Sequence, residues 1–209
     1  MIGTEDYYNK YLNGHSAAQI RTSIRGLKNE IGRLKNRMEH PDYRQRQDMP
    51  DDYAMLCCAR EYLSRAKDAL SEVGEQYVPS QAELKALYFD NNIGNITRLD
   101  FWIGGINCLF GKRTYQLEAE RVLLIQGDNS VEVLCGRKQF LDGIRSLHIG
   151  EWRHEYNLHR FGYEVLDGIQ WELDIYFLNG VKSVKIYGNN AYPYNFDKLC
   201  KLLGVELEF

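Results

Sequence analysis

The chain has 209 residues, of which 44% are hydrophobic and 26% are charged. This composition is typical of a globular protein with a sizeable core, and it excludes a disordered or collagen-like chain. The formal net charge of −3 excludes a global electrostatic bias toward nucleic acid or an anionic membrane.

Cysteine usage and hydropathy favour a cytoplasmic protein. The five cysteines form no C-x-x-C motif, and Cys57 and Cys58 are adjacent, so we expect reduced thiols rather than disulfides or a zinc site. The longest uncharged stretch, from Phe101 to Gly111, is too short to span a bilayer. The N-terminus lacks the basic and apolar regions of a secretion signal. We therefore expect cytoplasmic localisation and no membrane contact.

The first half of the chain carries two apolar stripes with helical spacing. One follows a capping box at Ser16 and Gln19, ends before Pro41, and has spacings of 4, 3, 4, 3 and 4: Ile20, Ile24, Leu27, Ile31, Leu34 and Met38. The other follows a cap at Asp51 or Asp52, ends at Gly74, and has spacings of 3, 4, 3, 4 and 3: Leu56, Ala59, Leu63, Ala66, Leu70 and Val73. Together they predict an antiparallel helical hairpin over about residues 16–73.

Two shorter helices are predicted on either side of this hairpin. Thr4 can start one that Gly14 ends. A second capping box, at Ser80 and Glu83, opens another helix that runs toward Phe89.

The second half of the chain changes to alternation with glycine punctuation, which is typical of strands. The expected strands lie at Thr97–Ile103, at Tyr115–Ala119 leading into Val122–Ile125, around Val131 and Val133 after a turn at Gly127–Asn129, and at Trp152–Leu158. Short amphipathic helices are expected at Phe140–Leu147 and at Phe196–Leu203, the latter capped by Asn195 and ended by Gly204.

The segment from Trp171 to Tyr187 predicts a β-hairpin with one defined register. Asn179-Gly180 is a preferred two-residue type I′ turn, in which both residues need positive φ. This turn places Leu178 opposite Val181, Ile175 opposite Val184 and Leu173 opposite Ile186. On the other face it sets Asp174 against Lys185, an opposite-charge pair.

These patterns predict an α+β protein, with an N-terminal antiparallel helical hairpin packed with a mainly antiparallel β-sheet that carries short helices. The boundary is expected near Asn91-Asn92, between a helical region of residues 1–92 and a sheet domain of residues 93–209.

The C-terminal part carries a resemblance. Its residues are Trp152, Tyr156, Asp167-Gly168, Gln170-Trp171 and the run Gly188-Asn189-Asn190-Ala191-Tyr192-Pro193-Tyr194-Asn195-Phe196. They resemble a module of uncharacterised small proteins of Firmicutes and their mobile elements, with the pattern "W…Y…DG-x-x-W … G-x-N-A-Y-P-x-N-F". The resemblance implies no chemistry, and we interpret the final motif as a fold-forming corner.

Side chains suited to catalysis or metal binding are few. Glu151, His154, Glu155 and His159 form the only local cluster of ligand types, and on a strand His154 would point away from the other three. A Cys–His pair could be drawn from Cys108, Cys135 or Cys200 with His148 or His154, but these cysteines lie in apolar surroundings. Glu118 and Glu120 could be paired carboxylates on a strand. No P-loop, dinucleotide motif or nucleophile elbow occurs, so we expect no catalytic residue, no cofactor and no metal.

A basic stripe on the first hairpin helix is the strongest candidate site. Residues 16–46 contain eight Lys or Arg and three Asp or Glu, whereas residues 47–92 contain four and nine. The stripe consists of Arg21, Arg25, Lys28 and Lys35. It can bind an acidic partner, or it can match the acidic second helix internally. No aromatic residues interleave it, which disfavours single-stranded nucleic acid.

We therefore expect a non-enzymatic protein-binding protein, in which the hairpin or the sheet edge engages another protein or a second copy of the chain. If the source is a phage or mobile element, an inhibitor or adaptor with an anti-defence role fits. The alternatives are a nucleic-acid-associated protein that uses the basic helix, and a small hydrolase whose site the sequence does not reveal.

Overall fold

The structure is a computed structural model that describes residues 2–44, 50–105, 108–127, 130–165 and 167–206. Contacts within the chain define two units, which we call the helical unit (Met1–Pro79) and the sheet unit (Ser80–Phe209). The division lies before the boundary expected near Asn91-Asn92. The reason is that the helix α4 (Gln81–Asn92) buries Phe89 in the core of the sheet unit. Packing of the hairpin on the sheet stays a prediction.

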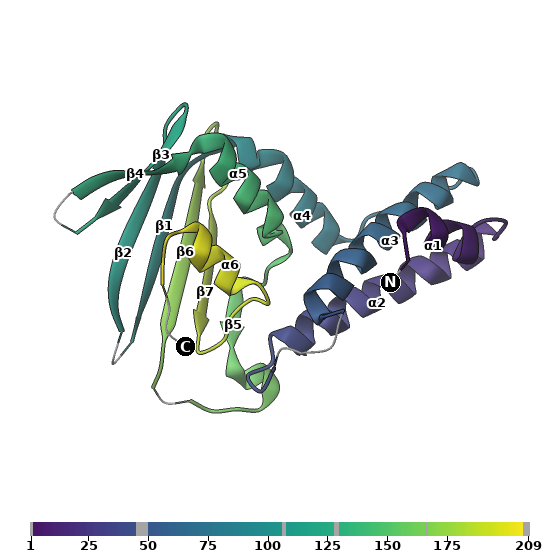
Figure 1. Ribbon diagram of the computed structural model, residues 1–209, viewed down its shortest axis with the longest axis horizontal. Helices are drawn as coiled ribbons and strands as arrows, with labels where there is room; N and C mark the ends of the chain where they lie inside the picture. The colour runs from purple at the N-terminus through teal and green to yellow at the C-terminus, as the bar shows by residue number, and fades with distance from the viewer. Residues whose placement is uncertain (1, 45–49, 106–107, 128–129, 166, 207–209) are drawn as a thin grey trace. The chain divides into compact units, whose positions relative to one another are not determined.

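The helical unit contains the predicted hairpin, formed by α2 (Ala17–Met38) and α3 (Asp52–Glu72), with α1 (Thr4–Tyr11) against α3 (Figure 1). Apolar residues near the start of α2 meet residues near the end of α3, as an antiparallel pair requires: Ile20 and Ile24 share a cluster with Ala66, Ala69 and Leu70. The amide N of Ser16 donates to Gln19 Oε1 (2.9 Å), and that of Ala54 donates to Asp51 Oδ1 (2.7 Å). Both predicted N-termini are confirmed.

The helix α1 completes the small core of the helical unit. Leu12, just after α1, is buried, and the Tyr7 ring stacks on the Tyr62 ring of α3 with centroids 4.2 Å apart. The Arg65 guanidinium lies 3.6 Å from the centroid of the Tyr8 ring. The aromatic residues before the hairpin therefore serve to cover α3.

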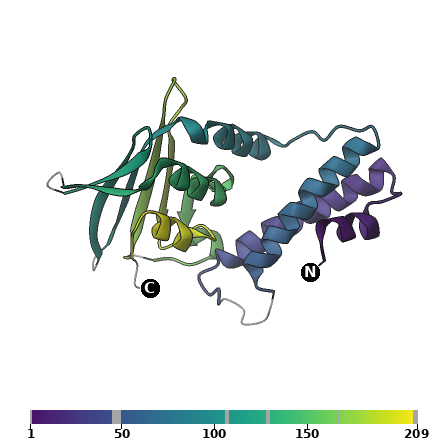
Figure 2. The ribbon, with the colours of Figure 1, turned by 45° about the horizontal axis from the view of Figure 1, so that its top comes forward.

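The sheet unit has seven strands in the order β4-β3-β2-β1-β6-β7-β5, and every neighbouring pair is antiparallel except β5 with β7. The strands are β1 (Ile96–Gly105), β2 (Cys108–Leu117), β3 (Arg121–Gln126), β4 (Ser130–Gly136), β5 (Glu155–Asn157), β6 (Gln170–Phe177) and β7 (Val184–Asn189). Two further helices, α5 (Arg137–Ser146) and α6 (Phe196–Leu202), lie on one face of the sheet (Figures 1 and 2). Short 3₁₀ turns span Ile93–Asn95, Ile149–Glu151 and Leu158–Phe161. The α+β class is confirmed.

One face of the sheet forms the core. Alternate residues of the strands, such as Leu99, Tyr115 and Leu173, are at most 1% exposed. Phe140 of α5 and Leu199 of α6 are buried in the same cluster. The alternate positions on the other face include polar residues such as Arg98, Asp100 and Thr114.

Two predicted strand segments differ from the structure. Tyr115–Ala119 does not lead directly into the next strand, because Glu118–Glu120 form a turn in which the Glu118 amide donates to Arg121 O (2.9 Å). Of the segment Trp152–Leu158 only β5 is a strand, since the flanking residues form 3₁₀ turns. The predicted turn at Gly127–Asn129 falls partly on residues 128 and 129, which lie outside the described residues.

The last helix also differs in its cap. Asn195 occupies the N-cap position of α6, but its side chain makes no capping bond. Its Nδ2 instead donates to the buried Leu147 carbonyl oxygen, 2.9 Å away, and so ties the start of α6 to the end of α5. Gly204, with φ of +62°, follows the helix as predicted.

The β6–β7 hairpin has the predicted register. Leu173 pairs with Ile186, Asp174 with Lys185 and Ile175 with Val184. The turn residues Asn179 and Gly180 have φ of 60° and 72°. Alternation and turn chemistry were therefore sufficient to fix this element.

The positive φ at Gly180 leads to a stability prediction. Replacing Gly180 with Val forces a β-branched residue into the left-handed region, and we expect a loss of about 1 kcal/mol or more. Gly180→Asn is the control, because Asn tolerates this region. Urea unfolding followed by tryptophan fluorescence reports on the sheet unit, which contains all three tryptophans. Equal urea midpoints for Gly180→Val and Gly180→Asn would argue against a positive φ at this position of the turn.

A second prediction concerns alkaline pH. Tyr115 donates its hydroxyl to Leu203 O (2.7 Å), and burial raises the pKa of this phenol to about 12. The stabilising contribution is complete below pH ~10, where the unfolded chain keeps its proton, and it is lost as the pH rises toward 12 at up to about 1.4 kcal/mol per pH unit. Tyr115→Phe should cost about 1 kcal/mol at neutral pH through the lost hydrogen bond. The difference in free energy of unfolding between Tyr115→Phe and wild type should then become smaller between pH ~10 and ~12. Parallel stability curves against pH would contradict this assignment.

Among the described residues, no helix combines the length and the apolar character needed to cross a bilayer.

Candidate functional site

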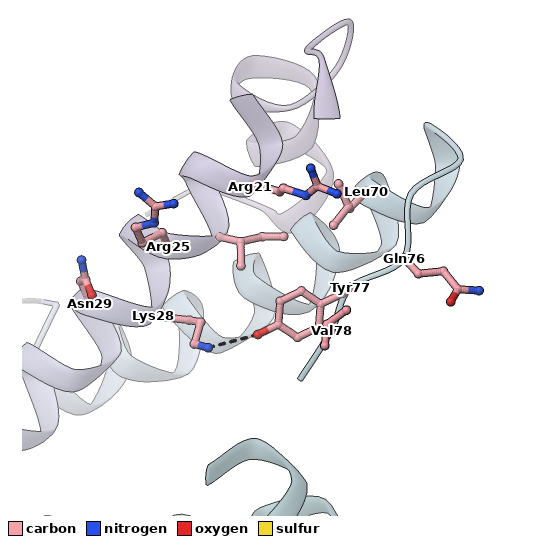
Figure 3. Close-up of a pocket in the computed structure, with 9 residues that line it drawn as sticks. Arg21, Arg25, Lys28, Asn29, Leu70, Gln76, Tyr77 and Val78 are labelled. Carbon is pink, nitrogen blue, oxygen red and sulfur yellow. Dashed lines mark hydrogen bonds between the residues drawn. The ribbon is translucent and has the colours of Figure 1, made fainter. Parts of the chain in front are cut away.

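Three of the four residues of the basic stripe line one open groove on the helical unit (Figure 3). The groove has a volume of about 510 Å³ and runs between α2, the end of α3 and the segment that follows α3. Its lining comprises Arg21, Ile24, Arg25, Lys28, Asn29, Leu70, Gln76, Tyr77 and Val78. Lys35 does not line it; this residue lies further along α2 and is half-buried.

The chain reversal after α3 builds the second wall of the groove. Gly74 adopts φ of +81°, and the Glu75 amide donates to Leu70 O (3.1 Å), which closes the last helical turn. The following segment then places Tyr77 opposite Lys28. Val78 is 83% exposed at the rim of the groove.

Tyr77 contacts the ammonium groups of two lysines. Lys28 Nζ donates to the Tyr77 hydroxyl oxygen (3.1 Å), and Figure 3 shows this bond spanning the groove. Lys67 Nζ lies 4.3 Å from the centroid of the same ring, within cation–π range. No aromatic residue interleaves the basic stripe in the sequence, and the aromatic ring beside Lys28 comes from Tyr77, in a distant part of the chain.

The arginines of the groove differ in their pairing. Arg21 Nη2 lies 2.5 Å from Glu75 Oε2, and both side chains are about half exposed, at 53% and 43%. Arg25 is exposed and makes no ion pair with any residue that the structure describes. Exposed pairs contribute about 0–1 kcal/mol, so Arg21 can exchange Glu75 for another carboxylate at little cost.

Part of the charge pairing between the two hairpin helices involves residues outside the basic stripe. Arg37, near the end of α2, forms an ion pair with Asp52 in the first turn of α3. The Asp52 side chain is fully buried, whereas that of Arg37 is 33% exposed. Neither residue belongs to the predicted stripe, because sequence spacing does not show which charge faces the partner helix.

The donor set of the groove suits binding of a carboxylate or phosphate beside an apolar group. Guanidinium and ammonium groups line its edges, and Ile24 and Leu70 contribute buried apolar surface. The described lining residues include no carboxylate, histidine, cysteine or serine.

The other chemical candidates do not form sites. The side chains of Glu151, His154, Glu155 and His159 are exposed, and among the described residues no group of three such side chains can hold a metal. Glu118 and Glu120 lie in the exposed β2–β3 turn, where Glu118 pairs with Arg121 at 2.7 Å.

Cys135 and Cys200 lie in surroundings that disfavour the thiolate. Burial raises the pKa of the Cys200 thiol to about 12 and also raises that of Cys135. The side chain of Cys108, the third cysteine considered for a Cys–His pair, lies outside the described part of the chain.

The C-terminal motif forms a buried corner of the sheet unit. Trp171 Nε1 donates to Ala191 O (2.9 Å), and a Cβ on Gly188 would lie 2.3 Å from that nitrogen. Asn190, with φ of 51°, accepts a hydrogen bond from the Ile169 amide through Oδ1 (2.8 Å). These contacts are structural and agree with the interpretation of the motif as a corner.

Comparisons with protein-family models, with curated proteins and with solved structures found no match to this chain.

The Arg37–Asp52 pair leads to a prediction for the helical unit. Asp52→Asn removes one charge of a partly buried pair and leaves Arg37 uncompensated, so we expect a loss of about 2 kcal/mol. Asp68→Asn, an exposed position on α3, is the matched control and should change stability little. Urea unfolding followed by the helical circular dichroism signal measures both. Equal urea midpoints for Asp52→Asn and Asp68→Asn would show that the Arg37–Asp52 pair does not stabilise the helical unit.

Proposed function

We propose that this chain is a non-enzymatic protein-binding protein, whose helical unit binds an acidic segment of a partner through the basic groove. The proposal is carried by one observation: Arg21, Arg25 and Lys28 line a single open groove together with the exposed apolar side chain of Val78. Such a surface complements a segment that carries both carboxylates and an apolar side chain.

The balance of charge favours a protein over nucleic acid. Residues 1–79 contain twelve Lys or Arg and twelve Asp or Glu, so the helical unit as a whole does not attract a polyanion. A nucleic-acid site requires basic residues along an extended backbone track. Here three cations are gathered at one end of the hairpin, beside Val78, which offers an apolar contact.

The resemblance of the C-terminal module to proteins of mobile elements supports a narrower form of the proposal. An inhibitor or adaptor that acts on a host system needs a binding surface and no catalytic centre. A nucleic-acid-associated role remains the alternative that the same experiment addresses. The hydrolase alternative has less support. His154 is exposed and its ring lies edge-on to that of Tyr187, and Glu118 forms an ion pair with Arg121.

The test replaces Arg21, Arg25 and Lys28 together with Gln in the full chain. The probe is the peptide fluoresceinyl-Glu-Glu-Phe-Glu-Glu-Leu-amide, with the label on its N-terminal amine, titrated at several salt concentrations. We expect about tenfold weaker binding and a shallower salt dependence in the variant, because three cations leave the groove. Thermal unfolding should change only modestly, since the variant loses the exposed Arg21–Glu75 ion pair and the Lys28–Tyr77 hydrogen bond.

The matched control changes Lys10, Arg33 and Arg44 to Gln. These side chains are exposed, lie in the same unit and remove the same charge, but do not line the groove. If both triple variants bind the peptide equally weakly, the loss of affinity reflects net charge and not the groove. Tighter binding of a DNA or RNA oligonucleotide than of the peptide at physiological salt, lost in the groove variant, would replace the proposal with nucleic-acid binding.

A further inference from the structure

A small cavity in the sheet unit lies between α4 and the β6–β7 hairpin. Its volume is about 60 Å³, and its walls are largely apolar: Tyr88, Phe89, Ile149, Phe177, Val184 and Ile186. Cavities that bind whole small molecules measure about 300–1,000 Å³, so this one is far too small for a cofactor or a nucleotide. Its size suits a single aliphatic side chain.

Exposed apolar residues adjoin this cavity. Leu84, Leu87 and Tyr88 are 45%, 49% and 56% exposed, and their spacing places them on one face of α4. Leu178, at the tip of the β6–β7 hairpin, is 52% exposed. Val181, which lines the cavity, donates its amide to Leu178 O (3.3 Å), so the hairpin tip and the cavity belong to one surface. A cluster of this kind around a preformed pocket is typical of the anchor region of a protein interface.

Two lysines give the cavity its charge preference. Lys85 and Lys182 both contribute to its lining, and both are exposed. Lys85 Nζ lies 3.5 Å from the Trp152 carbonyl oxygen, which holds this cation beside α4. No carboxylate contributes to the described lining. An occupant with an aliphatic group and flanking carboxylates therefore complements both features of the site.

We propose that this cavity is an anchor pocket for a Leu or Ile side chain of an acidic segment in a partner protein, with the neighbouring carboxylates of that segment contacting Lys85 and Lys182. The pocket belongs to the sheet unit and shares no residue with the basic groove. The inference therefore stands or falls independently of the function proposed for the helical unit.

The test uses methyl-labelled full-length protein and the peptide acetyl-Glu-Glu-Leu-Glu-Glu-amide. Titration should shift the methyl resonances of Ile149, Val184 and Ile186. A peptide with Ala in place of Leu should bind about fivefold more weakly or worse, because it fills less of the cavity. Lys182→Glu should weaken binding of the Leu peptide by about threefold to tenfold.

The control variant is Lys138→Glu, which makes the same charge change at an exposed position on α5 outside the cavity. The basic-groove triple variant should leave these methyl shifts intact. The proposal is overturned if the Leu and Ala peptides bind equally, if the methyl groups of these three residues do not respond, or if Lys138→Glu weakens binding as much as Lys182→Glu. Stronger shifts of the same methyl groups with an oligouridylate than with the peptide would assign the surface to RNA instead.

Discussion

Burial of one apolar face per element is the constraint on which both units depend. The sheet unit buries one side of its strands under α4, α5 and α6, and the helical unit buries the facing stripes of α2 and α3. Because each unit satisfies this constraint with its own residues, the surfaces that remain exposed are not needed to hold either core together. The basic groove and the α4 cavity both lie on such surfaces, which is why charge and apolar contact there can serve recognition.

Local signals in the sequence predicted the elements well where a turn or cap fixed them. The Asn179-Gly180 turn set a register that pairs Leu173 with Ile186, and the capping box at Ser16 located the start of α2. Prediction failed where long-range contacts decide the conformation. Trp152 and Tyr156 are both buried, although the strand here is only Glu155–Asn157 and 3₁₀ turns at Ile149–Glu151 and Leu158–Phe161 redirect the chain on either side. No local period encodes this path.

The same distinction applies to the candidate site. Helical spacing grouped Arg21, Arg25 and Lys28 correctly on one groove, since neighbours on a helix face are set by the helix itself. It also included Lys35, which the groove excludes, and it missed Tyr77, whose position depends on the reversal at Gly74. The available signal was Gly74, which ends the helix, followed three positions later by the aromatic residue Tyr77. The sequence alone does not show which helix Tyr77 contacts.

Two sites that favour acidic partners are compatible with a chain of net charge −3. At physiological ionic strength the screening length is about 8 Å, so a bound carboxylate responds mainly to charges within the site and little to the total. In the groove, the Arg25 side chain is exposed, whereas Asp52 and Glu72 of α3 pair with Arg37 and Arg65. In the α4 cavity the lining adds cations without carboxylates. Pairing of acidic side chains with cations of the same unit therefore leaves locally basic surfaces on a weakly acidic protein.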